Sequence, residues 1–397
     1  GCLVGSEMCI RDRLNIEICE LKIHKDQPEG LFDLFDNKSE YSSPNENDEA
    51  LVLHTSGTTS RPKIVPLSNN NIYSSSENIS ISLNLTDNDH CLNIMPLFHI
   101  HGLIAVLATS MKVGASVCAS SGFNALKFLD LARLEKITWY SGVPTMHQAI
   151  LLRANKNKEA AKNLNLRLIR SSSASLPPAV FKDLNDAFNC PVIEAYGMTE
   201  ATHQMTSNPL PPKQQKAGFV GLPAGPEVCI MSENGDMMKQ GEEGEVCIKG
   251  ENVTLGYENN EEANKTSFTN GWFRTGDQGY FDEDGYLKIS GRLKEIINKG
   301  GEKISPLEVD NVLMDHPSID QAVCFGYEDK MLGENIASAI IIKSGEMCSE
   351  EDVLKYAQEK LAKFKIPKKI FFVDEIPKGA TGKLQRNVLA KKFGLSS

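Results

Sequence analysis

The stretch LVLHTSGTTSRPK, residues 51–63, decides how the rest of the chain is interpreted. Its apolar start predicts a β-strand, and the loop that follows holds several hydroxyl groups, one glycine and two cations. Glycine lets a ligand approach the backbone closely, while amides, hydroxyls and a lysine donate to phosphoryl oxygens. The loop therefore predicts a phosphate-binding site made of Thr55, Ser56, Gly57, Thr58, Thr59 and Lys63.

Two other interpretations of this loop compete with the phosphate site. A Walker A loop ends in Gly-Lys followed by Ser or Thr, whereas this loop ends in Pro62-Lys63-Ile64, so a P-loop kinase is disfavoured. A flexible Ser/Thr linker is the remaining alternative, but linkers rarely follow an apolar strand directly.

Composition narrows the class of protein. The 397 residues are 41% hydrophobic and 24% charged, which predicts a globular protein of two or three packed units. A net charge of -10 argues against a nucleic-acid partner, and no apolar run reaches the length of a membrane-spanning helix. The ten cysteines are scattered and include no Cys-x-x-Cys pair, so neither a disulfide framework nor a zinc site is expected.

Between residues 51 and 195, short β-rich runs alternate with helical patterns, which predicts parallel βαβ units with helices on both sheet faces. A helical pattern covers residues 123–136, and Pro177-Pro178 suits the start of another helix. The predicted strands are Leu51–His54, Cys91–Met95, Ser116–Ala119, Ile137–Tyr140, Leu166–Ile169 and Val192–Ala195.

The pattern changes after Gly225 to short strands with two hairpin signals, Asn234-Gly235 and Asp284-Gly285, which predicts a β-rich subdomain at about 225–290. From Arg292 onward a compact α+β pattern follows. We therefore expect an α/β protein with a large domain (14–290), a hinge (291–294) and a small mobile α+β C-terminal lid domain (295–397). Residues 1–13 resemble a translated sequencing-adapter remnant and are left out of this fold.

Four further segments carry candidate chemistry. Tyr196-Gly-Met-Thr-Glu200 follows a predicted strand, where ligands bind in open α/β sheets; Tyr196 suits stacking on a base and Glu200 suits a Mg²⁺ ion carried by ATP. Asp277 suits ribose hydroxyls and Arg292 suits ribose or phosphate. Lys383 follows a glycine in a turn able to reach a cleft. Taken singly, each has a plainer alternative: an ordinary strand-to-turn exit for the first, a β-turn aspartate and a surface arginine for the next two, and a solvated lysine for the last.

Together and in this order, these five elements resemble the adenylate-forming superfamily of acyl-CoA synthetases, luciferases and peptide-synthetase adenylation domains, over residues 51–386. The resemblance implies ATP, Mg²⁺ and coenzyme A as ligands. It implies catalytic roles for Lys383 and His99, a hinge at Lys294, Mg²⁺ at Thr199 and Glu200, and coenzyme A beside Gly300 and Gly301. The nucleotide residues that it implies, besides the loop, are Ser172, Ala174, Ala195, Tyr196, Gly197, Met198, Thr199, Asp277 and Arg292.

The acid is indicated by the residues at the family's acyl pocket. Many relatives have small or apolar residues there, whereas this chain has His101, Ser172, Ser173 and His203. An apolar tail would leave such polar groups unpaired, at about 1 to 3 kcal/mol each, whereas a second carboxylate would satisfy them. Structural histidines are the alternative for His101 and His203. The chain is also similar to the oxalate–CoA ligase, peroxisomal-type branch across 195–210, 245–257 and 291–310, which favours oxalate.

Several alternatives stay open at this point. The acid is expected to be oxalate, against a 4-coumarate-type or a medium- or long-chain fatty acid. A catalytically silent nucleotide-binding relative would be expected to lack Lys383 or Glu200. A peptide-synthetase module would continue into a carrier domain, whereas this chain ends at Ser397.

The resemblance also gives expectations about the chain as a whole. We expect a missing N-terminal portion of the large domain, lower stability than that of a full-length protein, and no obligate protein partner. The end Gly394-Leu-Ser-Ser397 is not a Ser-Lys-Leu address, so a cytoplasmic location is expected, with a peroxisomal one as the alternative.

Overall fold

The computed structural model describes residues 44–55, 63–120, 122–379 and 383–395, together with the backbone of two short strands near the N-terminus. These strands, β1 (Lys22–Ile23) and β2 (Phe32–Asp33), pair antiparallel within a first compact unit, Gly1–Asn45. The second unit is Glu46–Ser397 and holds all the elements below. The predicted adapter-like segment, 1–13, lies outside the described residues.

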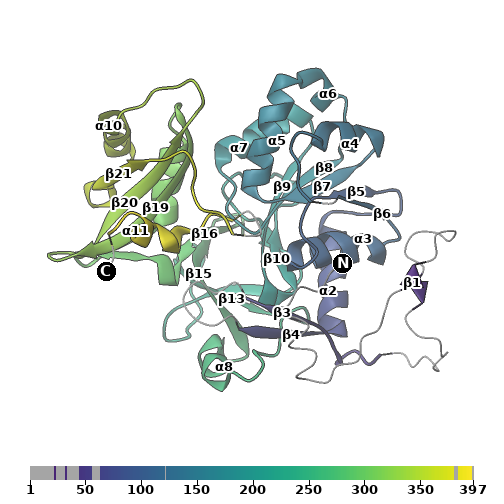
Figure 1. The fold of residues 1–397 in the computed structure, drawn as a ribbon. Helices are drawn as coiled ribbons and strands as arrows, with labels where there is room; N and C mark the ends of the chain where they lie inside the picture. The colour runs from purple at the N-terminus through teal and green to yellow at the C-terminus, as the bar shows by residue number, and fades with distance from the viewer. Residues whose placement is uncertain are drawn as a thin grey trace. The chain divides into compact units, whose positions relative to one another are not determined.

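A seven-stranded sheet forms the centre of the second unit, in the order β11-β10-β9-β8-β7-β5-β6 (Figure 1). The strands from β6 to β9 run parallel, as the alternating pattern predicts, and β10 and β11 continue the sheet antiparallel. The strands are β5 (His90–Asn93), β6 (Ser116–Ala119), β7 (Trp139–Gly142), β8 (Leu168–Ser171), β9 (Val192–Met198), β10 (His203–Ser207) and β11 (Leu222–Pro223).

Helices cover both faces of this sheet, because neighbouring strand residues point to opposite sides. Tyr140 and Ile169 pack on one face against α4, α5 and α7, whereas Trp139 and Leu168 pack on the other against α2 and a π-helical segment, η1. The prediction of two covered faces is confirmed. These helices are α2 (Asn69–Ser82), η1 (His101–Ala108), α3 (Thr109–Lys112), α4 (Phe128–Leu134), α5 (Pro144–Lys156), α6 (Lys158–Lys162) and α7 (Pro178–Phe188).

Two sequence predictions need correction here. The strand predicted at 51–54 is β3 (Glu49–His54), but it pairs antiparallel with β4 (Ile64–Ser68) in a separate two-stranded sheet rather than joining the parallel one. The segment that joins these two strands is the predicted phosphate loop, and an antiparallel pair needs no crossover connection. The helix predicted over 123–136 is shorter, because α4 covers only Phe128–Leu134.

A second, five-stranded sheet forms the predicted β-rich subdomain. Gly235 and Gly285 lie at the tight turns with φ of 88° and 80°, a backbone region that glycine adopts without strain. The long hairpin of β15 and β16 places Asp277 directly opposite Arg292. The elements are β12 (Glu227–Met231), β13 (Gly244–Lys249), α8 (Glu261–Ser267), β14 (Phe268–Thr269), β15 (Trp272–Phe281) and β16 (Leu287–Arg292).

The C-terminal part contains a third sheet, in the order β18-β17-β20-β19 with β21 beside β20, as its α+β pattern predicts. Ile297, Ile336 and Val353 belong to the core between this sheet and helices α9 and α10. The elements are η3 (Leu293–Glu295), β17 (Ile297–Lys299), β18 (Glu302–Ile304), α9 (Pro306–Met314), β19 (Ile319–Asp329), β20 (Gly333–Ile342), α10 (Glu350–Lys360), η4 (Lys363–Lys365), β21 (Lys369–Phe372), η5 (Arg386–Val388) and α11 (Leu389–Lys392).

Candidate active site

The predicted phosphate loop is closed at its base by its first and last residues. The amide of Thr55 donates to the carbonyl of Lys63 at 2.9 Å, and the amide of Lys63 donates to Thr55 Oγ1 at 3.2 Å. The loop therefore begins and ends at the same point, between β3 and β4. Ser56, Gly57, Thr58 and Thr59 lie outside the described residues, so their predicted role stays a prediction.

Tyr257, a residue that the sequence interpretation missed, lies between Lys63 and Glu200 and contacts both. The ammonium of Lys63 lies 4.0 Å from the ring centroid of Tyr257, and the Tyr257 hydroxyl donates to Glu200 Oε1 at 2.8 Å. Burial lowers the pKa of Lys63, and Lys294 lowers it further. The predicted phosphate-binding lysine, the predicted metal ligand and the predicted hinge lysine thus belong to one neighbourhood.

Glu200 is suited to hold a magnesium ion only together with ligands from another molecule. It is buried, and a carboxylate oxygen is a hard ligand of the kind that Mg²⁺ prefers. Over the described ranges, however, no group of three or more His, Cys, Asp or Glu side chains is placed to hold a metal. One carboxylate fits an ion that arrives on a polyphosphate, which keeps its other ligands.

Asp277 connects two of the predicted nucleotide residues. Its Oδ1 accepts from Arg292 Nε at 2.7 Å, and its Oδ2 accepts from the Tyr196 hydroxyl at 2.5 Å. Asp277 is buried while the Arg292 side chain is about half exposed, so the pair forms at the edge of the fold. The structure therefore brings together the predicted base-stacking residue and the two predicted ribose ligands.

Lys383 lies in the same neighbourhood, although more than 90 residues separate it from Arg292 in the chain. Burial lowers the pKa of Lys383 to about 8, Arg292 lowers it as well, and Asp277 and Glu200 oppose the shift. Three residues later, Arg386 forms ion pairs with Glu295 and Asp310. These pairs anchor the segment that carries Lys383 to the residues just after the predicted hinge.

The predicted acyl residues form a buried polar cluster beside this lysine. His101 is fully buried, its Nδ1 lies 3.0 Å from Ser173 Oγ, and its Nε2 lies 2.6 Å from Ser141 Oγ. The His203 ring is also buried, with its centroid 5.0 Å from that of His101. Burial lowers the pKa of both imidazoles well below the usual value, and the charges of Arg170 and Lys383 add to the effect. Both rings are therefore neutral at pH 7.

Arg170 is a member of this cluster that the sequence interpretation did not identify. Its side chain is fully buried, and it donates to Gln204 Oε1 at 3.1 Å and to Ser141 Oγ at 3.4 Å. Among the residues that the structure describes, no carboxylate forms an ion pair with it, and its Nε has no partner. A cation directly after Leu168-Ile169, in the β-rich run that was predicted as a strand, was the signal that could have identified it.

Backbone conformation also marks the cluster. Ser173 and His203 have φ of 72° and 99°, a region that residues other than glycine rarely adopt. Such strain of about 1 to 3 kcal/mol per residue persists where the surrounding structure enforces it, commonly at functional sites. Gly197 is required for a steric reason, because a Cβ there would stand 1.9 Å from the His203 carbonyl oxygen.

Other predicted residues are placed less favourably for ligand binding. The Ser172 hydroxyl is buried and donates to the carbonyl of Ala195 at 2.8 Å, so it already has a partner. Ala174 is exposed, and Met198 and Thr199 are half-buried. His99 is half-buried, accepts from the amide of His101, and has its pKa lowered to about 4, chiefly by burial. The structure brings His99 close to Lys383, which also lowers that pKa.

Gly300 and Gly301 are the predicted residues that the described contacts do not connect to this site. They form the turn between β17 and β18 with φ of 60° and 92°, and the amide of Gly300 donates to the carbonyl of Leu332. A Cβ added at Gly301 would meet nothing within 4 Å. The turn is therefore open on one side, and its predicted role with coenzyme A stays a prediction.

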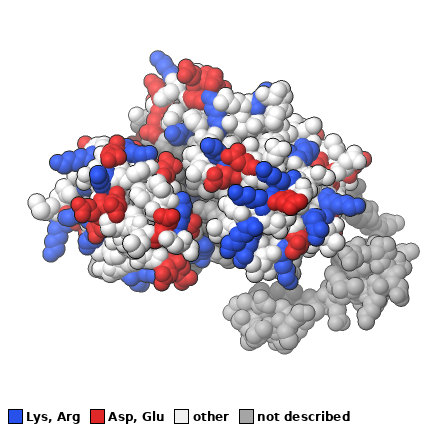
Figure 2. Space-filling model, turned by 90° about the horizontal axis from the view of Figure 1, so that it is seen from above, with Lys and Arg blue, Asp and Glu red and all other residues white. Residues whose placement is uncertain are grey.

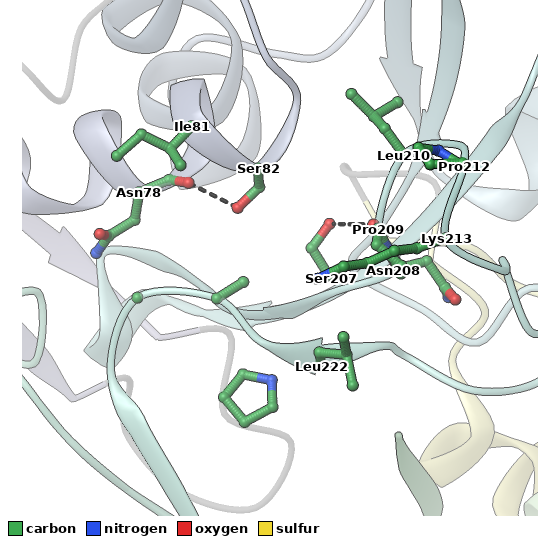
Figure 3. A pocket seen from close by; sticks show the side chains of 13 residues that line it. Asn78, Ile81, Ser82, Ser207, Asn208, Pro209, Leu210, Pro212, Lys213 and Leu222 are labelled. Carbon is green, nitrogen blue, oxygen red and sulfur yellow. Dashed lines mark hydrogen bonds between the residues drawn. The ribbon is translucent and has the colours of Figure 1, made fainter. Parts of the chain in front are cut away.

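A separate groove of about 440 Å³ lies between the end of α2 and the loop after β10 (Figure 3). Ile81 and Ser82 line one wall, and Leu210 and Leu222 line the opposite side. Gln204 stands between the groove and Arg170, because its amide donates to Ser82 Oγ and the Ala224 carbonyl while its oxygen accepts from Arg170. The Gln204 side chain thus separates the groove from the polar cluster.

Surface charge is mixed on the face that Figure 2 shows, where Lys and Arg side chains are interspersed with Asp and Glu. The chain's net charge of -10 agrees with the absence of a broad basic area among the coloured residues of this view. Among the helices that the structure describes, none has the length and apolar character needed to cross a bilayer. The sequence prediction that nucleic acid is no partner stays a prediction.

Two family models match the chain. The model of the AMP-binding enzyme family matches residues 9–258, and the model of the AMP-binding enzyme C-terminal domain matches residues 308–383. The first match alone covers more than half of the chain. Every residue of the Lys63, Glu200 and Tyr257 group lies within it, whereas Asp277 and Arg292 lie between the two matches and Lys383 ends the second.

The chain is similar to curated relatives and solved structures over most of its length. It is 51% identical to the oxalate–CoA ligase of Arabidopsis thaliana over 87% of this chain and 68% of the relative, and 49% identical to that of Saccharomyces cerevisiae over 88% and 64%. The crystal structure of ATP-bound MatB from Rhodopseudomonas palustris superposes with a TM-score of 0.83 at 32% identity, over 88% of this chain and 69% of that one. The chain thus spans about two thirds of the length of these relatives.

Proposed function

The chain belongs to the AMP-binding enzyme family, and on this premise we propose that it is an ATP-dependent acid–CoA ligase that converts oxalate into oxalyl-CoA. The reaction has two half-reactions. In the first, a carboxylate of the acid attacks the α-phosphorus of ATP and pyrophosphate leaves. In the second, the thiol of coenzyme A attacks the acyl-adenylate and AMP leaves. The two oxalate–CoA ligases that are about half identical to the chain support this assignment.

The cation arrangement supports the first half-reaction. Negative charge accumulates on the oxygens around the α-phosphorus, and preorganised cations in a site shielded from water stabilise such charge strongly. Lys63 reaches the site from the phosphate loop and Lys383 reaches it from the C-terminal part, where Asp277 and Glu200 help to hold it charged. Mg²⁺ bound to ATP at Glu200 would supply further positive charge. Tyr196, Asp277 and Arg292 are then left to hold adenine and ribose.

The polar cluster around His101 is the observation that supports oxalate as the acid. Both ring nitrogens of this fully buried histidine lie within hydrogen-bond distance of hydroxyl groups, and Arg170 and His203 complete a polar wall. A hydrocarbon chain placed here would leave those polar groups without hydrogen-bond partners, at a cost of about 1 to 3 kcal/mol for each group. Oxalate brings a second carboxylate one bond away from the reacting one, so a short anionic acid fits this wall.

For the second half-reaction we propose that the C-terminal domain rotates about Lys294, which withdraws Lys383 and brings Gly300 and Gly301 beside the entering thiol. The boundary at 291–294 is supported by the pairing of Asp277 with Arg292 on one side and of Glu295 with Arg386 on the other. One site then serves both steps.

Pyrophosphate exchange with four acids tests the proposed acid. The 397-residue chain is incubated with ATP, labelled pyrophosphate and one of oxalate, malonate, 4-coumarate or octanoate, and exchange is measured without coenzyme A. Oxalate is expected to give the highest kcat/KM, with malonate at least about tenfold lower because its extra carbon no longer fits. Exchange with coumarate or octanoate but not with the two diacids would refute the polar-wall argument.

A further inference from the structure

Arg170 carries a charge that no described carboxylate neutralises, in the most deeply buried part of the polar cluster. Burial lowers its pKa to about 9, so it remains protonated at pH 7. Burying an unpaired cation is costly, and such residues are normally paired or hydrogen-bonded to several acceptors. Its acceptors are Gln204, Ser141 and His203, and the last two are also partners or neighbours of His101.

The contact with His203 fixes where the proton of that imidazole resides. A guanidinium only donates hydrogen bonds, so His203 Nδ1, at 3.4 Å from the Arg170 Nη2, has to accept. The neutral ring therefore carries its proton on Nε2. That atom is buried and has no hydrogen-bond partner among the described residues. Arg170 thus leaves His203 with one buried donor that no described residue satisfies.

The contact with Ser141 fixes the proton positions in a second chain of hydrogen bonds, which runs from Arg170 through Ser141 and His101 to Ser173. Ser141 Oγ accepts from Arg170 and is fully buried, so its own proton requires an acceptor, and His101 Nε2 at 2.6 Å is the acceptor present. A buried hydroxyl proton without a partner would cost about 1 to 3 kcal/mol. His101 then carries its proton on Nδ1 and donates to Ser173 Oγ. The Ser173 hydroxyl, on a half-buried residue, is left as a donor.

We propose that Arg170 is a positioning residue that orients two hydrogen-bond relays, so that His203 Nε2 and Ser173 Oγ both present protons to the second carboxylate of the acid. This inference rests on the proposed function and names how that site selects a dianion. Two donors match the two oxygens of a carboxylate, and the buried positive charge of Arg170 favours an anion beside them. Lys383 serves the reacting carboxylate at the other end, so one cation acts on that end directly and Arg170 acts on the second carboxylate through the two relays.

Replacement of Arg170 tests the relay with oxalate and glycolate, which share a two-carbon frame but differ in the second carboxylate. Arg170→Met removes the donors and the charge, and is expected to lower kcat/KM for oxalate in pyrophosphate exchange at least about 100-fold while changing glycolate by less than about threefold. Arg170→Lys keeps the positive charge but replaces the planar guanidinium by a compact ammonium group. It is expected to lower the ratio of kcat/KM for oxalate to kcat/KM for glycolate about tenfold.

Arg167→Met is the matched control, because Arg167 adjoins the same strand but pairs with Asp89 instead. It is expected to lower thermal stability without changing the ratio of the two acids. If Arg170→Met does not fold, Arg170→Lys alone decides. An unchanged oxalate-to-glycolate ratio in the folded variants, or an equal change in the Arg167 control, would overturn the relay.

Imidazole ¹⁵N shifts provide a readout that needs no substrate. His203 is expected to be neutral and protonated on Nε2 in the native chain, and to lose that preference in the folded Arg170 variant. Protonation of His203 on Nδ1 in the native chain would overturn the relay even if oxalate is the substrate. Conversely, the expected shifts together with no exchange on oxalate would leave the relay standing and refute the proposed acid.

Discussion

Asp277 Oδ1 lies 2.7 Å from Arg292 Nε, directly across the β15–β16 hairpin. Arg292 ends β16 and is followed directly by η3, where the chain passes from the β-rich sheet to the C-terminal sheet. Asp277 also accepts from Tyr196, so a ribose bound here would approach a carboxylate whose position is already fixed from two sides. This preorganisation leads to the first prediction.

Asp277→Asn is expected to raise the KM for ATP about tenfold, because a charged acceptor for ribose hydroxyls and for Arg292 is replaced by a neutral amide. Steady-state pyrophosphate exchange measures the effect. Asp282→Asn is the control, since Asp282 lies in the same hairpin but pairs with Lys216. An Asp277 variant with the KM of the native chain would show that this carboxylate does not hold the nucleotide.

Lys383→Ala is expected to lower adenylate formation at least about 100-fold, which corresponds to roughly 2.7 kcal/mol of transition-state stabilisation. Thioester formation from supplied acyl-adenylate should stay within about threefold of the native rate, since the lysine is withdrawn in that step. Single-turnover measurements of each half-reaction provide the comparison. Lys378→Ala, at an exposed lysine of the same segment, should alter neither. Equal loss of both half-reactions would count against the assignment.

The pH dependence of the first half-reaction should reflect Lys383. Its pKa is lowered to about 8, so the side chain is charged below this pH and neutral above it. Because the charged form stabilises the transition state, kcat/KM for ATP is expected to fall above pH 8, approaching tenfold per pH unit. In Lys383→Ala this alkaline decline should be absent. A decline that persists unchanged in the variant would assign it to another group.

Lys294→Pro is expected to impair thioester formation more than pyrophosphate exchange, because proline fixes φ at the residue about which the domain is proposed to rotate. Lys294→Ala removes the same side chain and leaves the backbone free, so it separates loss of motion from loss of charge near Lys63. The ratio of the two half-reaction rates is the measured quantity. Equal damage to both steps by the proline variant would argue against a hinge at this position.

Much of the architecture follows from local patterns, and the exceptions have physical reasons. The runs near 91, 116, 139, 168 and 192 predict the parallel strands correctly, and four of these strands are largely buried, as strands covered on both faces are, while β6 at the edge of the sheet is more exposed. The strand at 49–54 has equally apolar residues, but its partner is set by the loop to β4, which periodicity does not reveal. The π-helical form of 101–108 likewise has no local signature.

The candidate site could be predicted where its residues belong to a sequence motif, and less so where a partner comes from a distant segment. Glu200 and Asp277 were predicted as candidates from their motifs, whereas Tyr257 joins Lys63 to Glu200 only through tertiary packing. Arg170 was missed because an arginine at the end of a predicted strand is ordinarily exposed. Its complete burial comes with contacts to Ser141 of β7 and to His203 and Gln204 of β10, and a sequence pattern does not show this tertiary packing.

Product analysis tests the central claim most directly. The chain is incubated with Mg-ATP, oxalate and coenzyme A, and nucleotides and thioesters are quantified together by chromatography and mass spectrometry. AMP, pyrophosphate and oxalyl-CoA are expected in equal amounts, with AMP formation dependent on oxalate. Release of ADP and phosphate in place of AMP and pyrophosphate, or a thioester formed from an apolar acid but not from oxalate, would contradict it.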